Sequence, residues 1–289
     1  MRTARYLLLA FALIPLSGTC QSFNWGFPFR VDDETDHTVM HFRDGDIFRL
    51  KAKYNPVSFD YNIALDQLSE AELERVNSID LTAETRTAGN ELKRHLDLYQ
   101  KDGRDFVFFS TEYDGKTKEV KLFRQDVNVA SGERTPYTLL SSVEGKGVFN
   151  TGNFKTAQSP DGNYFAILKI PAFYKKEQEK FTVEVYDADF KKIKEINQVF
   201  DRQAVRGPLY SIEIGNDGEV YVMASLDMKK SLPHVEMYTS GLADTEMATT
   251  SFKQPDDYQL LQNYMQFIGS DLCIISLVSW AGSGEVQIG

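Results

Sequence analysis

The sequence predicts an all-β fold: a β-propeller of four-stranded antiparallel blades, with four recognisable blades and part of a fifth. Four times, at intervals of about 56 to 59 residues, Asp-Gly opens a short apolar run that carries an aromatic residue at the same place. Asp-Gly is the strongest short-range signal for a tight turn between strands. The runs that follow alternate between apolar and polar residues, the period of a strand. Repeated units of this kind are best packed as the blades of a ring, which leaves only short edges.

The four turns define equivalent positions in the repeat. They are Asp44 and Gly45, Asp102 and Gly103, Asp161 and Gly162, and Asp217 and Gly218. The aromatic residues four positions after each aspartate are Phe48, Phe106, Phe165 and Tyr221. We expect all four rings to point into the cores between blades, so these motifs are structural turns and not parts of a reactive site.

Each turn organises a set of strands. The third unit contains apolar or alternating runs over 154–158, 164–170, 181–186 and 193–199. The fourth repeats the plan over 210–214, 220–225, 234–238 and 248–252, and the second over 107–110, 120–125 and 138–141. The first unit is less regular, and capping-box spacing there favours a short helix over 69–78 unless strand pairing overrides it.

The domain organisation follows from these units. Residues 1–20 are expected to be a signal peptide, 21–37 an aromatic and acidic N-terminal segment, and 38–289 the propeller. The blades are expected at 38–97, 98–150, 151–205 and 206–255, with a partial blade at 256–289. Because the last unit ends inside an alternating strand pattern, we expect the chain to be a fragment. Within 21–37, alternate aromatic residues from Phe23 to Phe29 share one face; we favour a docked strand over a ligand-stacking face.

The N-terminus predicts export. Arg2 and Arg5 precede an apolar stretch over 6–16, and small residues follow up to Cys20, which together make a secretory signal. The destination is the periplasm, the outer membrane surface or the extracellular space. No segment approaches the roughly 20 apolar residues of a transmembrane helix. Cys20 is a candidate lipid anchor, but ordinary cleavage near residue 20 also fits and is the interpretation we favour. The other cysteine, Cys273, is predicted to be a small buried hydrophobe in a strand.

Charge excludes one class of partner. The net charge of −10 becomes about −12 once the signal peptide is removed. Since nucleic-acid binding depends on clustered Lys and Arg, no nucleic-acid partner is expected. Membrane contact is expected only through lipidation of Cys20.

The turn motifs also carry a resemblance. The stretch from Ser159 and Pro160 through Asp161 and Gly162 resembles the Ser-Pro-Asp-Gly repeat of the Tol-associated propeller family. The segment 215–221 is similar to the Asp-Gly repeats of other bacterial periplasmic propellers. The resemblance covers roughly residues 38 to 252 and implies the propeller fold. It identifies no functional subfamily, because the motif reports a turn that feeds a strand.

Few residues indicate chemistry. His37 and His41 are four apart, but no third ligand is indicated and no metal site is expected. The acidic run 32–36 lacks the glycine and ligand register of an EF-hand. No nucleophile or phosphate-loop signature is present, so no cofactor is expected and the catalytic residues are unknown.

Two functions remain open from sequence alone. The first is a non-enzymatic binding or scaffolding module in the bacterial envelope, for a protein, peptide or glycan partner. The second is a polysaccharide-active hydrolase or lyase that uses acids or histidines near the propeller axis. The lack of a catalytic signature favours the binding module, while two carboxylates converging on the axis would favour the enzyme.

Overall fold

The computed structural model describes most of the chain from residue 35 onward. The described ranges are 35–43, 46–55, 60–69, 75–81, 94–101, 105–147, 150–204, 209–226, 234–252, 258–280 and 286–288. The compact unit Asp36–Gly289 carries the fold. Cys20, the aromatic residues from Phe23 to Phe29, and the turns at Asp44, Gly45, Asp102 and Gly103 lie outside the described residues.

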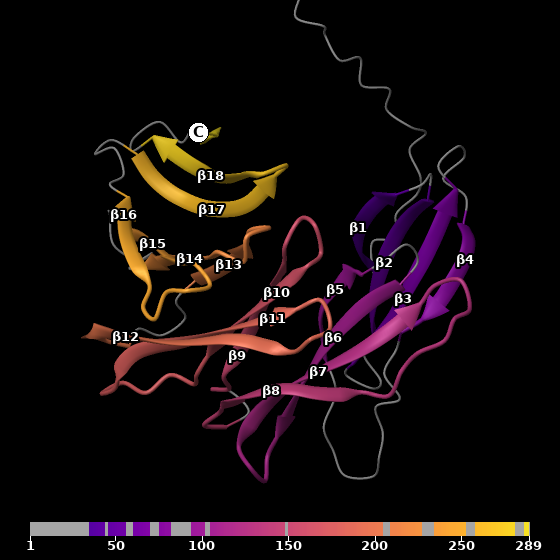
Figure 1. The fold of residues 1–289 in the computed structure, drawn as a ribbon, viewed down its shortest axis with the longest axis horizontal. Coiled ribbons are helices and arrows are strands. Elements are labelled where there is room, and N and C mark those ends of the chain that lie inside the picture. The colour runs from indigo at the N-terminus through magenta and orange to yellow at the C-terminus, as the bar shows by residue number, and fades with distance from the viewer. Residues whose placement is uncertain are drawn as a thin grey trace, which may run out of the picture. The chain divides into compact units, whose positions relative to one another are not determined.

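The described residues form strands and no helix, arranged in five sheets (Figure 1). Sheet 1 contains β1 (Thr35–Arg43), β2 (Asp46–Asn55), β3 (Asp60–Ser69) and β4 (Arg75–Asp80). Sheet 2 contains β5 (Arg94–Gln100), β6 (Asp105–Asp114), β7 (Glu119–Asn128) and β8 (Thr138–Glu144). Sheet 3 contains β9 (Asn153–Gln158), β10 (Tyr164–Ile170), β11 (Gln178–Asp187) and β12 (Lys192–Gln203). Sheet 4 contains β13 (Leu209–Ile214), β14 (Val220–Leu226), β15 (His234–Ser240) and β16 (Ala248–Phe252). Sheet 5 contains β17 (Tyr258–Ile268), β18 (Asp271–Trp280) and β19 (Val286–Ile288).

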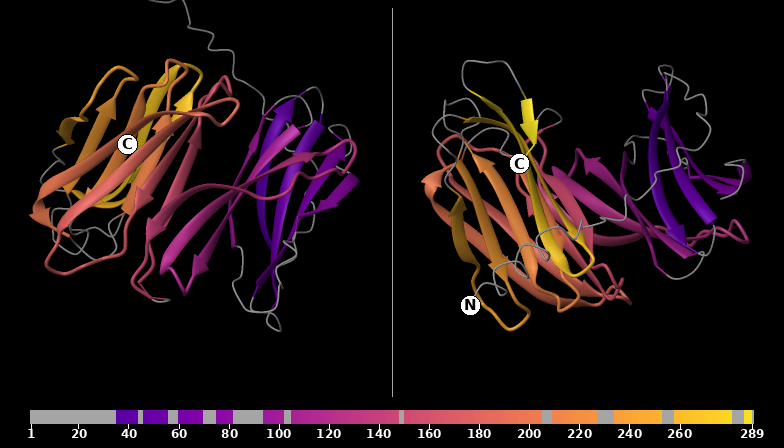
Figure 2. Two further views of the ribbon diagram at one scale, coloured as in Figure 1. Left: turned by 60° about the horizontal axis from the view of Figure 1, so that its bottom comes forward. Right: turned by 90° about the horizontal axis from the view of Figure 1, so that it is seen from above.

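In every sheet the strands pair in chain order, so each sheet is a simple meander (Figure 2). Four four-stranded sheets and a fifth of three strands confirm the predicted fold class. The helix expected over 69–78 is wrong where the structure describes it, because Arg75–Asp80 forms strand β4 and pairs with β3. Strand pairing has therefore overridden the local capping signal. No helix that could span a membrane occurs in the described parts of the chain.

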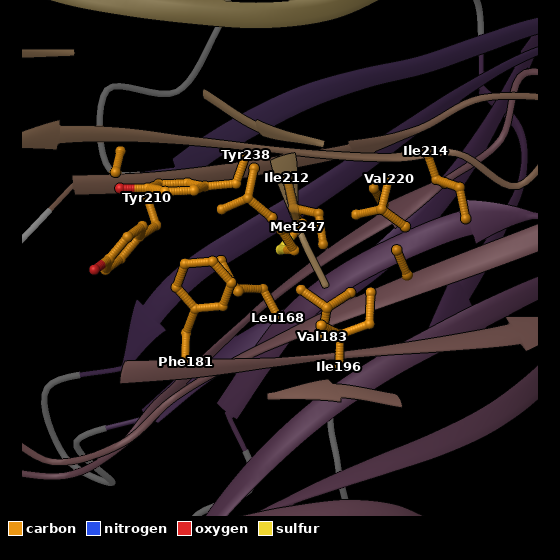
Figure 3. Packing of buried hydrophobic residues seen from close by; sticks show 14 of the residues in the cluster. Leu168, Phe181, Val183, Ile196, Tyr210, Ile212, Ile214, Val220, Tyr238 and Met247 are labelled. Atoms are coloured by element: carbon orange, nitrogen blue, oxygen red, sulfur yellow. The ribbon is translucent and has the colours of Figure 1, made fainter. Parts of the chain in front are cut away.

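Consecutive sheets share apolar cores. One cluster joins sheets 1 and 2, a second joins sheets 2 and 3, and a third joins sheets 3 and 4. In the third, Leu168 and Val183 of sheet 3 face Ile212 and Val220 of sheet 4 (Figure 3). A smaller cluster around Met265 joins sheets 4 and 5. This sheet-on-sheet packing is the interaction between blades that the repeat predicts.

The four aromatic residues of the repeat do not all face the same way. Phe48, Phe106 and Phe165 are buried, as expected, whereas Tyr221 is only partly buried. Phe106 and Phe165 face the preceding sheet, but Phe48 and Tyr221 face the following one. All four rings therefore lie in cores between sheets, but they do not face the same neighbouring sheet.

The turns explain part of this difference. The carbonyls of Asp105, Tyr164 and Glu219 accept the hydrogen bonds that close the second, third and fourth turns. Phe106 and Phe165 come directly after the closing residue, while Tyr221 comes two residues after it. A shift of one residue places a side chain on the other face of a strand.

Cys273 also differs from its prediction. It lies in β18 as a free cysteine of intermediate burial, so it is not a core residue. It pairs with Gln266, on the face of sheet 5 that carries the exposed Tyr264 and Ile275. That face packs against none of the apolar clusters formed by the described residues.

Candidate functional site

The first strands of consecutive sheets lie next to one another. Strand β5 contacts β9, and β9 contacts β13. Four polar side chains on these strands lie near one another: Asp97 and Tyr99 on β5, Thr156 on β9 and Glu213 on β13. We call these four residues the inner-strand cluster.

Asp97 is held by hydrogen bonds from two sheets. The hydroxyls of Tyr99 and Thr156 both donate to its Oδ2, each at 2.9 Å. The Leu98 N–H donates to Oδ1 at 3.3 Å, and the Tyr99 and Thr156 hydroxyls lie 3.1 Å apart. Burial raises the pKa of Asp97, while these hydrogen bonds oppose the rise because they stabilise the carboxylate. The result is a carboxylate that is fixed in place and ties β5 to β9.

Glu213 has a different environment. Its carboxyl makes no hydrogen bond or ion pair with any described residue, and the side chain is half-buried. Burial is the main cause that raises the pKa of Glu213 to about 7, and the negative charge of Asp97 adds to it. A half-buried carboxyl with a raised pKa and no bonding partner among the described residues is a candidate functional group.

The two carboxyls can divide the roles of acid and base. Burial raises the pKa of both carboxyls: that of Glu213 to about 7, and that of Asp97 against the opposing effect of its donated hydrogen bonds. The donated hydrogen bonds favour the ionised form of Asp97, whereas Glu213 receives none from the described residues, so Glu213 is the better candidate for the protonated partner of an acid–base pair. Burial also raises the pKa of Tyr99 well above its ordinary value, so that its hydroxyl stays a hydrogen-bond donor to Asp97.

The raised pKa of Glu213 predicts how stability depends on pH. Below about pH 4.5 the carboxyl is neutral in both the folded and the unfolded protein, so Glu213 does not lower the free energy of unfolding. Between about 4.5 and 7 the unfolded chain releases the proton and the folded protein retains it, so the free energy of unfolding falls as pH rises. The loss is expected to reach roughly 2 to 3 kcal/mol after allowance for partial exposure. Urea unfolding across this range measures it.

Glu213→Gln should remove this pH dependence and be more stable than the natural protein above pH 7. Glu219→Gln, the same substitution in the turn before β14, is the control and should leave the dependence in place. If the free energy of unfolding varied with pH in the same way for the natural protein and for Glu213→Gln, a raised pKa of Glu213 would be contradicted.

A second polar cluster joins sheets 3 and 4. The guanidinium of Arg202 donates to Glu179 at 2.6 Å, to Glu236 at 2.7 Å and to the Tyr238 hydroxyl at 3.3 Å. The hydroxyls of Tyr210 and Tyr238 donate to Glu179 and Glu236 respectively. Because every member of this Arg202 cluster is already bonded to another, the cluster is structural.

The predicted turn residues are described in two of the four repeats. Asp161 and Gly162 join β9 to β10, and Asp217 and Gly218 join β13 to β14. Both glycines have φ of +77°, a left-handed conformation that favours glycine. The two turns are also linked, because the Asp161 N–H donates to the Asn216 side chain at 3.0 Å. None of these residues belongs to the inner-strand cluster.

The histidines all lie on strands, but their side chains are outside the described part of the structure. His37 and His41 are on β1, His95 on β5 and His234 on β15. Within the described part of the chain, no three His, Cys, Asp or Glu side chains are grouped so as to hold a metal ion.

Neither Asp97 nor Glu213 was predicted from sequence as a site residue. The sequence analysis predicted no strand at the position of β5, and so it did not consider Asp97. The repeat could have indicated this strand, because β9 ends just before Asp161 and the equivalent strand of the second unit, β5, ends just before Asp102. Glu213 lies in a predicted strand, but only the fold brings it near Asp97.

Comparisons with known proteins identify the fold and not a family. No family model matches the chain, and no curated protein matches it. Among solved structures, a polysaccharide lyase matches with 12% identity and a TM-score of 0.51, covering 87% of this chain and 57% of the lyase. An α-L-arabinofuranosidase from Fusarium graminearum matches with 10% identity and a TM-score of 0.50, covering 88% and 75%. The propeller domain of the Trilobed protease from Pyrococcus furiosus matches with 10% identity and a TM-score of 0.42, covering 87% and 70%.

The sheets, their shared cores and the two structures matched at TM-scores of 0.50 and 0.51 define the fold of this protein as a β-propeller. The chain spans little more than half of the lyase that it resembles. Membership of the Tol-associated family is not confirmed by any family match.

Proposed function

We propose that this propeller hydrolyses glycosidic bonds, with Glu213 as the general acid and Asp97 as the carboxylate that opposes it. One observation carries the proposal: Glu213 is a half-buried carboxyl without a bonding partner among the described residues, and it lies close enough to Asp97 for their charges to interact. Glycoside hydrolysis typically uses such a pair of carboxyl groups, one protonated and one ionised.

The chemistry follows from the two environments. The protonated Glu213 carboxyl donates its proton to the leaving oxygen as the bond to the sugar breaks. The Asp97 carboxylate, held by Tyr99 and Thr156, stabilises the positive charge that develops on the sugar or accepts a proton from the attacking water. The fixed position of Asp97 means that no reorganisation is needed during the reaction.

The similar structures support carbohydrate as the substrate class. The two with TM-scores of 0.50 or above are a polysaccharide lyase and an α-L-arabinofuranosidase. Export through the residue 1–20 signal is also part of the proposal, since an exported protein meets polysaccharides outside the cytoplasm.

A non-enzymatic binding module is the second candidate. The hydrogen bonds around Asp97 favour this candidate, because they join sheets 2 and 3 and so would stabilise the fold even if Asp97 had no catalytic role. The position of Glu213 is not explained by this role, so hydrolysis is the first proposal.

The test is a turnover assay with para-nitrophenyl glycosides, including the α-L-arabinofuranoside, and with neutral and uronate-containing polysaccharides. We expect release of reducing ends, with kcat/KM falling as pH rises above about 7, because Glu213 then loses the proton that it must donate. Release of unsaturated uronate products would show that the protein is a lyase and not a hydrolase. Binding of a glycan without turnover of any substrate would overturn hydrolysis in favour of the binding module.

A further inference from the structure

A cavity lies in sheet 2 beside the loop that joins β7 to β8. Its volume is about 300 Å³. Sites for small ligands start at about this volume and combine apolar walls with a few placed polar groups, and about 150 Å³ is already enough to hold benzene. The residues that line the cavity are Gln125, Arg134, Thr135, Pro136 and Tyr137. The cavity therefore has room for one small organic ring.

The cavity is lined by a buried hydrogen-bond acceptor that has no partner. Gln125 is 6% exposed, and its Nε2 donates to the Thr135 carbonyl at 2.8 Å. This bond fixes the orientation of the amide, and Oε1 then accepts no hydrogen bond from the described part of the chain. A buried acceptor without a partner lowers stability. A ligand that donates an O–H or N–H to Gln125 would remove this cost.

The second polar group of the cavity is a cation. Arg134 is exposed, and its guanidinium makes no hydrogen bond or ion pair with the residues that the structure describes. The neighbouring carboxylate of Asp126 does not neutralise it, because Arg124 already binds Asp126 through two hydrogen bonds of 2.7 and 2.5 Å. A guanidinium presents its N–H groups as a fork that matches a carboxylate or a sulfate. Arg134 is therefore available to bind an anion.

The loop that carries these groups is held in place before any ligand arrives. Arg134 forms a β-bridge with Val127. The Thr135 N–H donates to the Asp126 carbonyl, and the Thr135 hydroxyl accepts from the Asp126 N–H, each at 2.9 Å. Tyr137 packs against the apolar core between sheets 1 and 2. A wall fixed by its own contacts loses little entropy on binding.

These groups define the chemistry of the ligand. It must carry an anion for Arg134, a hydrogen-bond donor for Gln125, and an apolar surface for the Pro136 and Tyr137 side of the cavity. An anionic sugar residue supplies all three within one ring, through its carboxylate or sulfate, its hydroxyls and its C–H face. An acidic side chain of a peptide fits less well, because an ionised carboxylate accepts hydrogen bonds but donates none.

We infer that this cavity is a binding site for an anionic sugar residue of a polysaccharide. It is separate from the inner-strand cluster. Gln125 lies two residues before Val127 and so shares its face, which packs toward sheet 1, whereas Tyr99 packs in the core shared with sheet 3. Strand β6 lies between β7 and β5, so the two sites are at least about 10 Å apart. The inference does not depend on the acid role of Glu213.

The test is calorimetry of the natural protein with three oligosaccharides of equal length, built from galacturonate, sulfated galactose and neutral galactose. We expect the anionic oligosaccharides to bind, with an affinity that falls as salt is added. Arg134→Gln should weaken this binding by roughly tenfold or more, because charge-assisted hydrogen bonds are lost. Arg134→Lys retains the charge without the fork and should restore part of the affinity. Lys116→Gln removes one positive charge from the exposed turn before β7 and is the matched control.

Binding that is weakened in Arg134→Gln and retained in Lys116→Gln and Glu213→Gln would support a separate anionic-sugar site, whether or not any glycoside is hydrolysed. Preference for the galacturonate or the sulfated oligosaccharide would then identify the anion. Three results would overturn the inference: no binding of either anionic oligosaccharide, equal binding of the neutral one, or an unchanged affinity in Arg134→Gln. Tighter binding of a peptide rich in Asp and Glu would also overturn it, because the site would then recognise protein.

Discussion

Replacing Glu213 by glutamine is expected to lower kcat/KM for glycoside cleavage by roughly 10² to 10⁴. Glutamine retains the shape of the side chain but has no proton to donate, so the leaving oxygen must depart as an anion. The loss should depend on the leaving group. It should be large for an alkyl or sugar leaving group and much smaller for dinitrophenyl, which departs readily without protonation.

This dependence separates an acid from a structural residue. A residue that only supports the fold would lower the rates of both substrates by the same factor. Glu219→Gln makes the same chemical change in the turn before β14, where the carboxylate accepts a bond from Tyr221 at 2.7 Å, and it should leave turnover intact. Uniform loss across leaving groups in Glu213→Gln would count against the acid role.

Phe165→Ala is expected to reduce the free energy of unfolding by roughly 3 to 5 kcal/mol, the usual cost of deleting a buried aromatic ring. Phe165 is 1% exposed, and its ring centre lies 4.4 Å from that of Phe190 and 6.0 Å from that of Tyr99. Its loss leaves a cavity in the core between sheets 2 and 3. Chemical denaturation measures the change.

Tyr264→Ala is the control for this substitution. Tyr264 is 52% exposed on sheet 5, so its truncation should change stability by much less. A near-neutral effect of Phe165→Ala would contradict the packing between sheets 2 and 3. Phe165 packs against Tyr99, and the Tyr99 hydroxyl holds Asp97 in place. Because the proposed reaction uses Asp97, Phe165→Ala should also reduce glycoside turnover by this protein.

The fold was largely predictable because its signals are local. Asp-Gly turns and alternating runs located the strands of sheets 3 and 4, for example β10 (Tyr164–Ile170) and β13 (Leu209–Ile214). The direction in which Tyr221 faces was not predictable from the period. It depends on which residue closes the turn before the strand, because a shift of one residue moves a side chain to the other face of the sheet.

The candidate site was not predictable for a different reason. Asp97, Thr156 and Glu213 are far apart in sequence and are brought together only because the first strands of three sheets are neighbours. Neither carboxylate belongs to a motif. Their chemistry arises from burial and from each other, and neither can be read from spacing along the chain.

Sheets 3 and 4 are joined at both ends of β13. The Arg202 cluster lies at its start, through Tyr210, and the bond from Asp161 to Asn216 lies just beyond its end, with the shared apolar core between them. A pair of sheets connected in this way can separate only by breaking all three together. We therefore expect these two sheets to open together as a single cooperative unit.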